Sequence, residues 1–139
     1  MFDAILIVDD DPDDANLIRK TVLDLHPKRS AQTVISGLDL KAYLAGQGRY
    51  ADREAFPYPG LILLDLRMPE MDGFEVMEWL KIQRLHAAIP VIVISAFGQQ
   101  QNIRRAYQLG ARTFLSKPVH PENIRDAIRA LMLPIEFFD

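Results

Sequence analysis

The stretch Leu61–Gly73 reads LILLDLRMPEMDG, in which four apolar residues lead directly into Asp65 and then into a turn. A short apolar run between turn signals is typical of a strand that is buried on both faces of a parallel sheet. Similar runs occupy residues 4–8, 91–94 and 113–116. The residues that directly follow these four runs are Asp9 and Asp10, Asp65, Ser95 and Lys117. The stretch therefore predicts a parallel sheet whose strands end in polar residues.

These polar residues predict a phosphoryl-accepting metal site, because ligands of parallel sheets bind beyond the carboxyl ends of the strands. Three carboxylates favour Mg²⁺, with Asp10 and Asp65 as the expected direct ligands and Asp9 acting through water. A carboxylate is also a competent nucleophile for phosphoryl transfer. Lys117 can contact a phosphoryl oxygen as a point charge, and Ser95 offers a hydroxyl from the other side. Without metal, at least one of the carboxylates should have a raised pKa.

Each of these residues also has a simpler interpretation when it is taken alone. A single aspartate after a strand is most often a turn residue or a helix cap. Asp11, Asp13 and Asp14 are expected only to favour the start of a helix. Lys117 before Pro118 would most often be a solvated lysine. The functional interpretation rests on the joint arrangement, in which complementary charges fall at the ends of separate strands.

The composition fits one ordinary globular domain and excludes several classes of site. The chain has 139 residues, and 49% of them are hydrophobic. It contains no cysteine, so a disulfide framework, a zinc-thiolate site and a thiol nucleophile are impossible. A net charge of -3 gives no electrostatic reason to expect nucleic-acid binding. No apolar run approaches the roughly 20 residues that span a bilayer, and no basic signal region is present, so we expect no membrane partner and a cytoplasmic location.

Helical patterns alternate with the apolar runs and predict an α/β fold. The class is a doubly wound five-stranded parallel sheet with five helices on its two faces. Asp11 is expected to cap the first helix, which begins at Pro12 and ends at His26. Ser36 is expected to cap the second helix. The remaining expected elements are strands at 32–35 and 112–115 and helices after Gly73, at 99–109 with Gly110 as its cap, and at 121–133.

The longest irregular stretch, residues 46–60, contains three aromatic residues, Tyr50, Phe56 and Tyr58. Loops of this length in compact domains are usually functional or mobile. Two interpretations stay open. The aromatic side chains pack over the second helix, or they form an exposed patch for a partner protein.

Four segments of the chain resemble the receiver domain of two-component response regulators: residues 7–11, 63–73, 93–96 and 115–118. The resemblance covers essentially the whole length. It implies a flavodoxin-like receiver fold with strand order 2-1-3-4-5, and one receiver domain over residues 1–139 with an apolar tail at about 133–139. It also implies that the phosphodonor is a histidine of a partner kinase.

The resemblance assigns a role to each matching position. Asp65 matches the phosphoacceptor, and Asp9 and Asp10 match the acidic pair that holds Mg²⁺. The other matches are Arg67 (a backbone carbonyl ligand of Mg²⁺), Lys117 (the phosphate contact), Ser95 (the switch hydroxyl), Phe114 (the switch aromatic) and Pro118 (preceded by a typically cis bond). Such a protein catalyses only its own phosphorylation and dephosphorylation.

Output and subfamily follow from the same resemblance. With no output segment expected, the protein should signal by protein–protein contact, or serve as a phosphorelay intermediate or phosphate sink. Residues 11–14, 56–59 and the long loop look similar to single-domain regulators that are paired with phytochrome-type kinases. The apolar tail folds back on the protein, or it contacts a kinase or a second copy in a homodimer.

The residues disfavour three other functions: a phosphohydrolase, a degenerate scaffold and a cofactor-binding protein. A Mg²⁺-dependent aspartyl phosphohydrolase typically has a general acid two residues after its nucleophile, where this chain has Arg67, which cannot donate a proton at neutral pH. A degenerate scaffold would lack some of the site residues. A flavodoxin-like cofactor binder would need a phosphate-cradling loop in place of the acidic residues 9–14. One further expectation concerns Phe97, which should flank the phosphoryl entrance with Arg67 and exclude water, giving a long-lived acyl phosphate.

Overall fold

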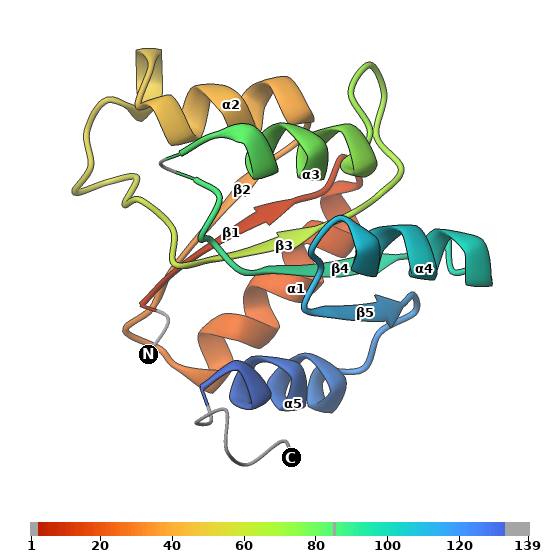
Figure 1. Ribbon diagram of the computed structural model, residues 1–139. Coiled ribbons are helices and arrows are strands. Elements are labelled where there is room, and N and C mark those ends of the chain that lie inside the picture. Colours follow the sequence, from red (N-terminus) through yellow and green to blue (C-terminus); the bar gives the residue numbers. More distant parts are fainter. Residues whose placement is uncertain (1–2, 85, 133–139) are drawn as a thin grey trace.

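The computed structural model describes residues 3–84 and 86–132, in which strands alternate with helices (Figure 1). The strands are β1 (Ala4–Val8), β2 (Ser30–Val34), β3 (Leu61–Leu64), β4 (Val91–Ser95) and β5 (Thr113–Ser116). The helices are α1 (Pro12–Leu25), α2 (Gly37–Ala45), the 3₁₀ turn η1 (Gly48–Tyr50), α3 (Gly73–Ile82), α4 (Gln100–Gln108) and α5 (Pro121–Leu131). All neighbouring strands are parallel, in the order β2-β1-β3-β4-β5. The predicted fold class and strand order are confirmed.

Helices cover both faces of the sheet, with α1 and α5 on one face and α2, α3 and α4 on the other (Figure 1). Alternate residues of β1 therefore enter two separate cores. Leu6 packs on the side of α2 and α3, whereas Ile7 packs on the side of α1 and α5. Burial on both faces explains why the central strands are continuous apolar runs rather than alternating ones.

The register of the strands places the candidate residues next to one another. Val8 of β1 pairs with Leu64 of β3, so the next residues along the two strands are Asp9 and Asp65. At the other side of the sheet, β4 and β5 end level with each other. Lys117 directly follows that end, and its backbone N–H donates to the carbonyl of Ser95 at 3.0 Å.

The start of α1 follows from local sequence as predicted. The carboxylate of Asp11 accepts hydrogen bonds from the backbone N–H groups of Asp13 and Asp14, which would otherwise lack partners. Pro12 occupies the first helical position, and His26 ends the helix. Ser36 caps α2 in the same way, through the N–H of Asp39.

Some element boundaries differ from the predicted ones. Strand β2 begins at Ser30, which pairs with Ala4, and it ends before Ile35, whose N–H donates to the Asp39 carboxylate instead of to a strand. Strand β5 lies one residue later than predicted. Helix α4 has Leu109 as its cap residue, and Gly110 follows with a φ of 107°. Helix α5 ends at Leu131, with Met132 as its cap residue, before the predicted end at residue 133.

The long loop packs against α2 through two of its three aromatic residues. Tyr50 is 3% exposed, and its ring lies 4.9 Å from that of Tyr43 in α2 and 5.2 Å from that of Phe56. Arg53 holds the loop by donating to the carbonyls of Tyr43 and Leu44 at the end of α2. The interpretation as packing over α2 is therefore correct for Tyr50 and Phe56, and an exposed patch of all three residues is excluded.

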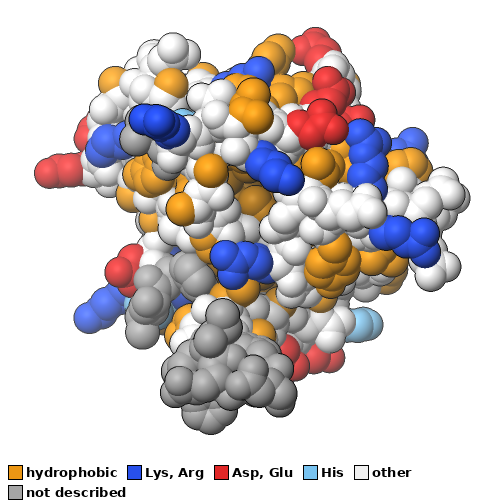
Figure 2. Space-filling model, in the orientation of Figure 1, with side chains coloured by type: hydrophobic (Ala, Val, Ile, Leu, Met, Phe, Trp, Pro, Cys, Tyr) orange, Lys and Arg blue, Asp and Glu red, His pale blue; other side chains and the backbone are white. Residues whose placement is uncertain are grey.

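Exposed hydrophobic side chains are scattered among charged and uncharged ones on the face shown in Figure 2. Isolated exposed apolar residues of this kind are normal for a folded protein. None of the described helices is long and apolar enough to cross a membrane. The predicted apolar tail at 133–139 lies outside the described residues.

Candidate functional site

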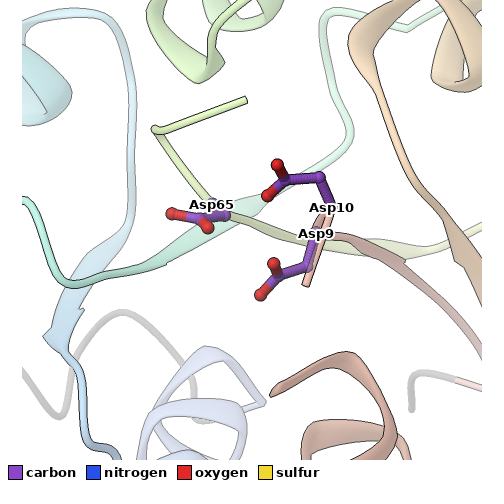
Figure 3. A group of neighbouring side chains, drawn as sticks. All are labelled: Asp9, Asp10 and Asp65. Atoms are coloured by element: carbon purple, nitrogen blue, oxygen red, sulfur yellow. The ribbon is translucent and has the colours of Figure 1, made fainter. Parts of the chain in front are cut away.

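The carboxyl ends of β1 and β3 bring three aspartates together (Figure 3). Asp9, Asp10 and Asp65 each offer a carboxylate oxygen within 4.8 Å of the others. Asp9 is buried, and its Oδ1 accepts a hydrogen bond from the backbone N–H of Asp11 at 3.0 Å. Asp10 is exposed and lines the neighbouring cleft. The sequence prediction of a shared acidic site at the edge of the sheet is therefore confirmed in its geometry.

Asp65 is held in place by the backbone on both sides. Its N–H donates to the carbonyl of Val8 at 2.9 Å, and its Oδ1 accepts from the N–H of Arg67 at 3.3 Å. Gly73, at the start of α3, packs directly against this segment, and a Cβ at Gly73 would lie 2.6 Å from the carbonyl oxygen of Asp65. Only glycine allows so close an approach, which explains the Asp72-Gly73 pair that follows the turn.

Lys117 reaches across the sheet edge and contacts three carboxylates. Its Nζ lies 2.8 Å from Oδ2 of Asp9, 2.9 Å from Oδ2 of Asp14 and 3.2 Å from Oδ2 of Asp65. Burial acts to lower the pKa of Lys117, but the hydrogen bonds to Asp9 and Asp14, together with the negative charges of Asp65 and Asp9, outweigh it and raise the pKa above its ordinary value. Lys117 is therefore fully charged at neutral pH.

The electrostatics of Asp9 fit the expectation that one carboxylate has a raised pKa. Burial is the largest cause, the hydrogen bond from Lys117 opposes it, and the charge of Asp65 adds to the increase. Repulsion from the neighbouring carboxylate of Asp65 therefore raises the pKa of Asp9 less than burial does. Among the described residues, the ammonium of Lys117 is the one cation that contacts Asp9, Asp14 and Asp65. The carboxylate of Asp10 lies beside Asp9 and Asp65, so the site carries an excess of negative charge.

Asp14 is the residue that sequence reasoning missed. It was expected only to favour the start of α1, yet its carboxylate pairs with Lys117, which is 103 residues away in the sequence. Its place in the first turn of α1, four residues after Asp10, is the only signal that could have suggested this role.

A cleft of about 390 Å³ opens beside the three aspartates. The guanidinium of Arg67 lies over the ring of Phe97 at 5.6 Å, and both residues line the cleft together with Asp10. The remaining lining residues are Leu66, Met68, Pro69, Asp72 and Phe74. Arg67 and Phe97 thus lie together in the cleft that Asp10 lines, and their position at the phosphoryl entrance stays a prediction.

Ser95 lies at the end of β4, and Phe114 lies within β5. Ser95 is fully buried, and its Oγ accepts a hydrogen bond from the backbone N–H of Phe97 at 3.1 Å. Phe114 is partly buried against the core on the side of α2 and α3. The Lys117–Pro118 peptide bond is cis, as the resemblance implied.

Residues 5–129 match the response regulator receiver domain family. The chain belongs to this family. Receiver domains are signalling proteins rather than enzymes that turn over external substrates, and they bind a divalent cation at an acidic pocket of the kind that Asp9, Asp10 and Asp65 form.

Two curated relatives show the range of this receiver family. The sporulation initiation phosphotransferase F of Bacillus subtilis is 33% identical, over 93% of each chain. The DNA-binding dual master transcriptional regulator RpaA of Synechocystis is also 33% identical, over 92% of this chain. The chain thus spans about half (48%) of the length of RpaA.

Solved structures of response regulators resemble this receiver. The phosphorylated cyanobacterial regulator RcpA has a TM-score of 0.78 and is 28% identical, over 94% of this chain and 91% of its own. The Mn²⁺-bound form of the response regulator Rcp1 has a TM-score of 0.71 and is also 28% identical, over 93% of this chain and 91% of its own.

Proposed function

We propose that this receiver accepts a phosphoryl group on Asp65 from a phosphohistidine of a partner kinase and signals by protein–protein contact. The observation that carries the proposal is the position of Lys117, whose ammonium lies 3.2 Å from Asp65 Oδ2 while Asp9 and Asp10 flank the same carboxylate. A nucleophilic carboxylate with an adjacent fixed cation is what phosphoryl transfer requires.

The acidic residues fit a bound Mg²⁺. Carboxylate oxygens are hard ligands of the kind that Mg²⁺ prefers. The ammonium of Lys117 does not neutralise all of the carboxylates, so the remaining negative charge would attract a divalent cation. Asp10 and Asp65 are the proposed direct ligands, with Asp9 acting through water and the backbone carbonyl of Arg67 as a further ligand. Bound Mg²⁺ would neutralise charge on the transferring phosphoryl group.

The reaction needs few groups of the protein itself. An oxygen of the Asp65 carboxylate attacks phosphorus, the bond between phosphorus and the histidine nitrogen breaks, and that nitrogen keeps the electron pair. The product is an acyl phosphate on Asp65. Lys117 donates a hydrogen bond to a phosphoryl oxygen and so balances the added negative charge.

Ser95 and Phe114 are the proposed switch. Phosphorylation would draw the Ser95 hydroxyl away from the N–H of Phe97 and toward a phosphoryl oxygen. Phe114 would then move inward into the space beside Ser95. Phe114 lacks a hydroxyl, so its outward position is not held by a side-chain hydrogen bond and depends on packing alone.

The partner is proposed to be a phytochrome-type histidine kinase, because phytochrome response regulators are among the related structures. The exchange would take place in the cytoplasm, and a second copy of the chain is a further possible partner. A relay or phosphate-sink role is the alternative, and it is favoured by the likeness to a sporulation phosphotransferase.

Phosphotransfer profiling tests the proposal. Candidate kinases carrying a radiolabelled phosphohistidine are mixed with the protein, with and without Mg²⁺, and Asp65→Asn is the control. We expect rapid labelling of the wild type by one kinase, only in the presence of Mg²⁺, and none of the variant. Labelling of Asp65→Asn at the wild-type rate would rule out Asp65 as the acceptor. Retention of label by the regulator supports signalling, whereas onward transfer to a histidine protein supports the relay.

A further inference from the structure

The ammonium of Lys117 has no donor left for a further partner. An ammonium carries three N–H donors, and those of Lys117 are directed at Asp9, Asp14 and Asp65. A phosphoryl group on Asp65 would replace the contact to that carboxylate. Asp9 and Asp14 would remain, so two anions would still compete with the phosphoryl oxygens for the same positive charge.

The two competing carboxylates differ in environment. The side chain of Asp9 is 2% exposed and belongs to the proposed metal site, whereas that of Asp14 is 41% exposed and lies outside that group of three. Asp14 lines a small pocket with Lys117 and Pro118, apart from the cleft beside Asp10. Asp14 therefore holds Lys117 from the side that faces away from the cleft.

The orientation of Asp14 is not explained by the needs of its helix. In α3, the residue at the third helical position, Glu75, bonds back to the N–H of the cap residue Asp72 and completes a capping box. Asp14 is the corresponding residue of α1. There the N–H of the cap residue Asp11 is already bonded to Asp9, and Asp14 is directed at Lys117 instead.

We propose that Asp14 is a positioning residue that restrains Lys117 and weakens the attraction of its ammonium for an incoming phosphoryl group. This inference rests on the proposed function of Asp65. Removing the charge of Asp14 should leave Lys117 more strongly positive toward an anion on Asp65. It should also make the site less negative as a whole, so that a divalent cation is held less tightly.

Asp14→Asn is the informative variant, because it removes the charge and keeps the size and one acceptor oxygen. Asp13→Asn is the matched control. Asp13 lies in the same first turn and is exposed. Asp13→Asn therefore changes the net charge by the same amount as Asp14→Asn and removes a similar interaction with the helix dipole. It leaves the three hydrogen bonds of Lys117 in place.

Two affinities are measured for the wild type and both variants: that for Mg²⁺ alone, by calorimetry, and that for trifluoroberyllate, an acyl-phosphate mimic, at saturating Mg²⁺, by fluorine NMR. For Asp14→Asn, we expect Mg²⁺ to bind more weakly and trifluoroberyllate more tightly, each by about twofold to fivefold at low salt, the range of partly exposed ion pairs. Both changes should shrink at high salt. Asp13→Asn should lie close to the wild type.

The opposite signs distinguish this role from a structural one, since a distorted site would weaken both affinities. If Asp14→Asn weakens both, or matches Asp13→Asn in both, the inference is wrong while the proposed function stands. If the wild type binds no trifluoroberyllate and is not labelled in phosphotransfer, the proposed function and the inference fail together.

Discussion

The guanidinium of Arg67 lies 5.6 Å from the centre of the Phe97 ring, and the two side chains line the same cleft as Asp10. The contact places an apolar ring, rather than a carboxylate or an amide, at the entrance for water. Hydrolysis of an acyl phosphate needs a water molecule in line with the phosphorus, and we expect a ring at this position to hinder the binding of that water.

Replacing Phe97 by glutamate should therefore shorten the lifetime of the acyl phosphate. The carboxylate would admit water and accept a hydrogen bond from it, and we expect decay about tenfold faster, a modest share of what general-base groups can contribute. The measurement is the loss of label from phosphorylated protein after the kinase has been removed.

Phe97→Leu is the control for that measurement, because leucine keeps an apolar side chain while losing the contact with the Arg67 guanidinium. Its decay should stay close to that of the wild type. Equal decay of the wild type and Phe97→Glu would show that the ring does not control access of water.

His86 should make the stability of the fold depend on pH. Its ring stacks with those of Tyr58 and Trp79, and the hydroxyl of Tyr58 is hydrogen-bonded to Nδ1. Burial, and then the positive charge of Arg53, lower the pKa of His86 below its ordinary value of 6.5. The folded state thus prefers the neutral ring, and the stability present above about pH 6.5 is lost as the pH falls through the lower folded pKa.

The test compares the free energy of unfolding at pH 7.5 and pH 5.5, followed by the fluorescence of Trp79. In His86→Gln, we expect a smaller loss between the two pH values than in the wild type. His120→Gln serves as the control, because His120 is exposed and makes no cap hydrogen bond. An unchanged pH dependence in His86→Gln would contradict the assignment.

The sequence predicted features that depend on neighbouring residues or on strand ends. The cap at Asp11, the start at Pro12 and the meeting of Asp9 with Asp65 all follow from local chemistry and parallel register. The end of β2 was misplaced by one residue, because Ile35 looks like a strand residue. Its N–H is taken by Asp39 of the next helix, and the side chain is 63% exposed.

The features that the sequence could not predict are contacts between side chains and groups that are distant in the sequence. The contact between Asp14 and Lys117 requires the relative position of α1 and β5, which no local pattern contains. The same holds for Arg53, whose donors reach the carbonyls of Tyr43 and Leu44 at the end of α2. The aromatic residues of the loop suggested packing, but not the cation that fixes it.

Tyr50 should contribute to stability through both its ring and its hydroxyl. The ring is almost fully buried, and the hydroxyl donates to Asp39 at 2.7 Å and accepts from Arg49 at 2.8 Å. We expect Tyr50→Ala to cost about 3–5 kcal/mol, as for other buried aromatic residues, and Tyr50→Phe about 1 kcal/mol. Urea unfolding measures both.

Tyr58→Ala is the matched comparison in the same loop, since Tyr58 is 41% exposed. We expect Tyr58→Ala to lose less unfolding free energy than Tyr50→Ala. If the two alanine variants were equally stable, the loop would not be held by the buried ring.

Gly73 and Gly37 provide a test of how closely the acceptor segment is packed, because each is the first residue of its helix. A Cβ at Gly73 would lie 2.6 Å from the backbone oxygen of Asp65, which cannot move without displacing the acceptor. A Cβ at Gly37 would instead lie 2.7 Å from Sδ and 2.9 Å from Cβ of Met71, so it would meet that side chain rather than the backbone of Asp65. We expect Gly73→Ala to lose about 2 kcal/mol of unfolding free energy, within the range for overpacking, and to accept phosphoryl groups more slowly. Gly37→Ala should also lose stability, because the Cβ of Met71 cannot rotate away from the added methyl group, but it should accept phosphoryl groups at the wild-type rate. A wild-type rate of phosphorylation in Gly73→Ala would show that the backbone at Asp65 can yield.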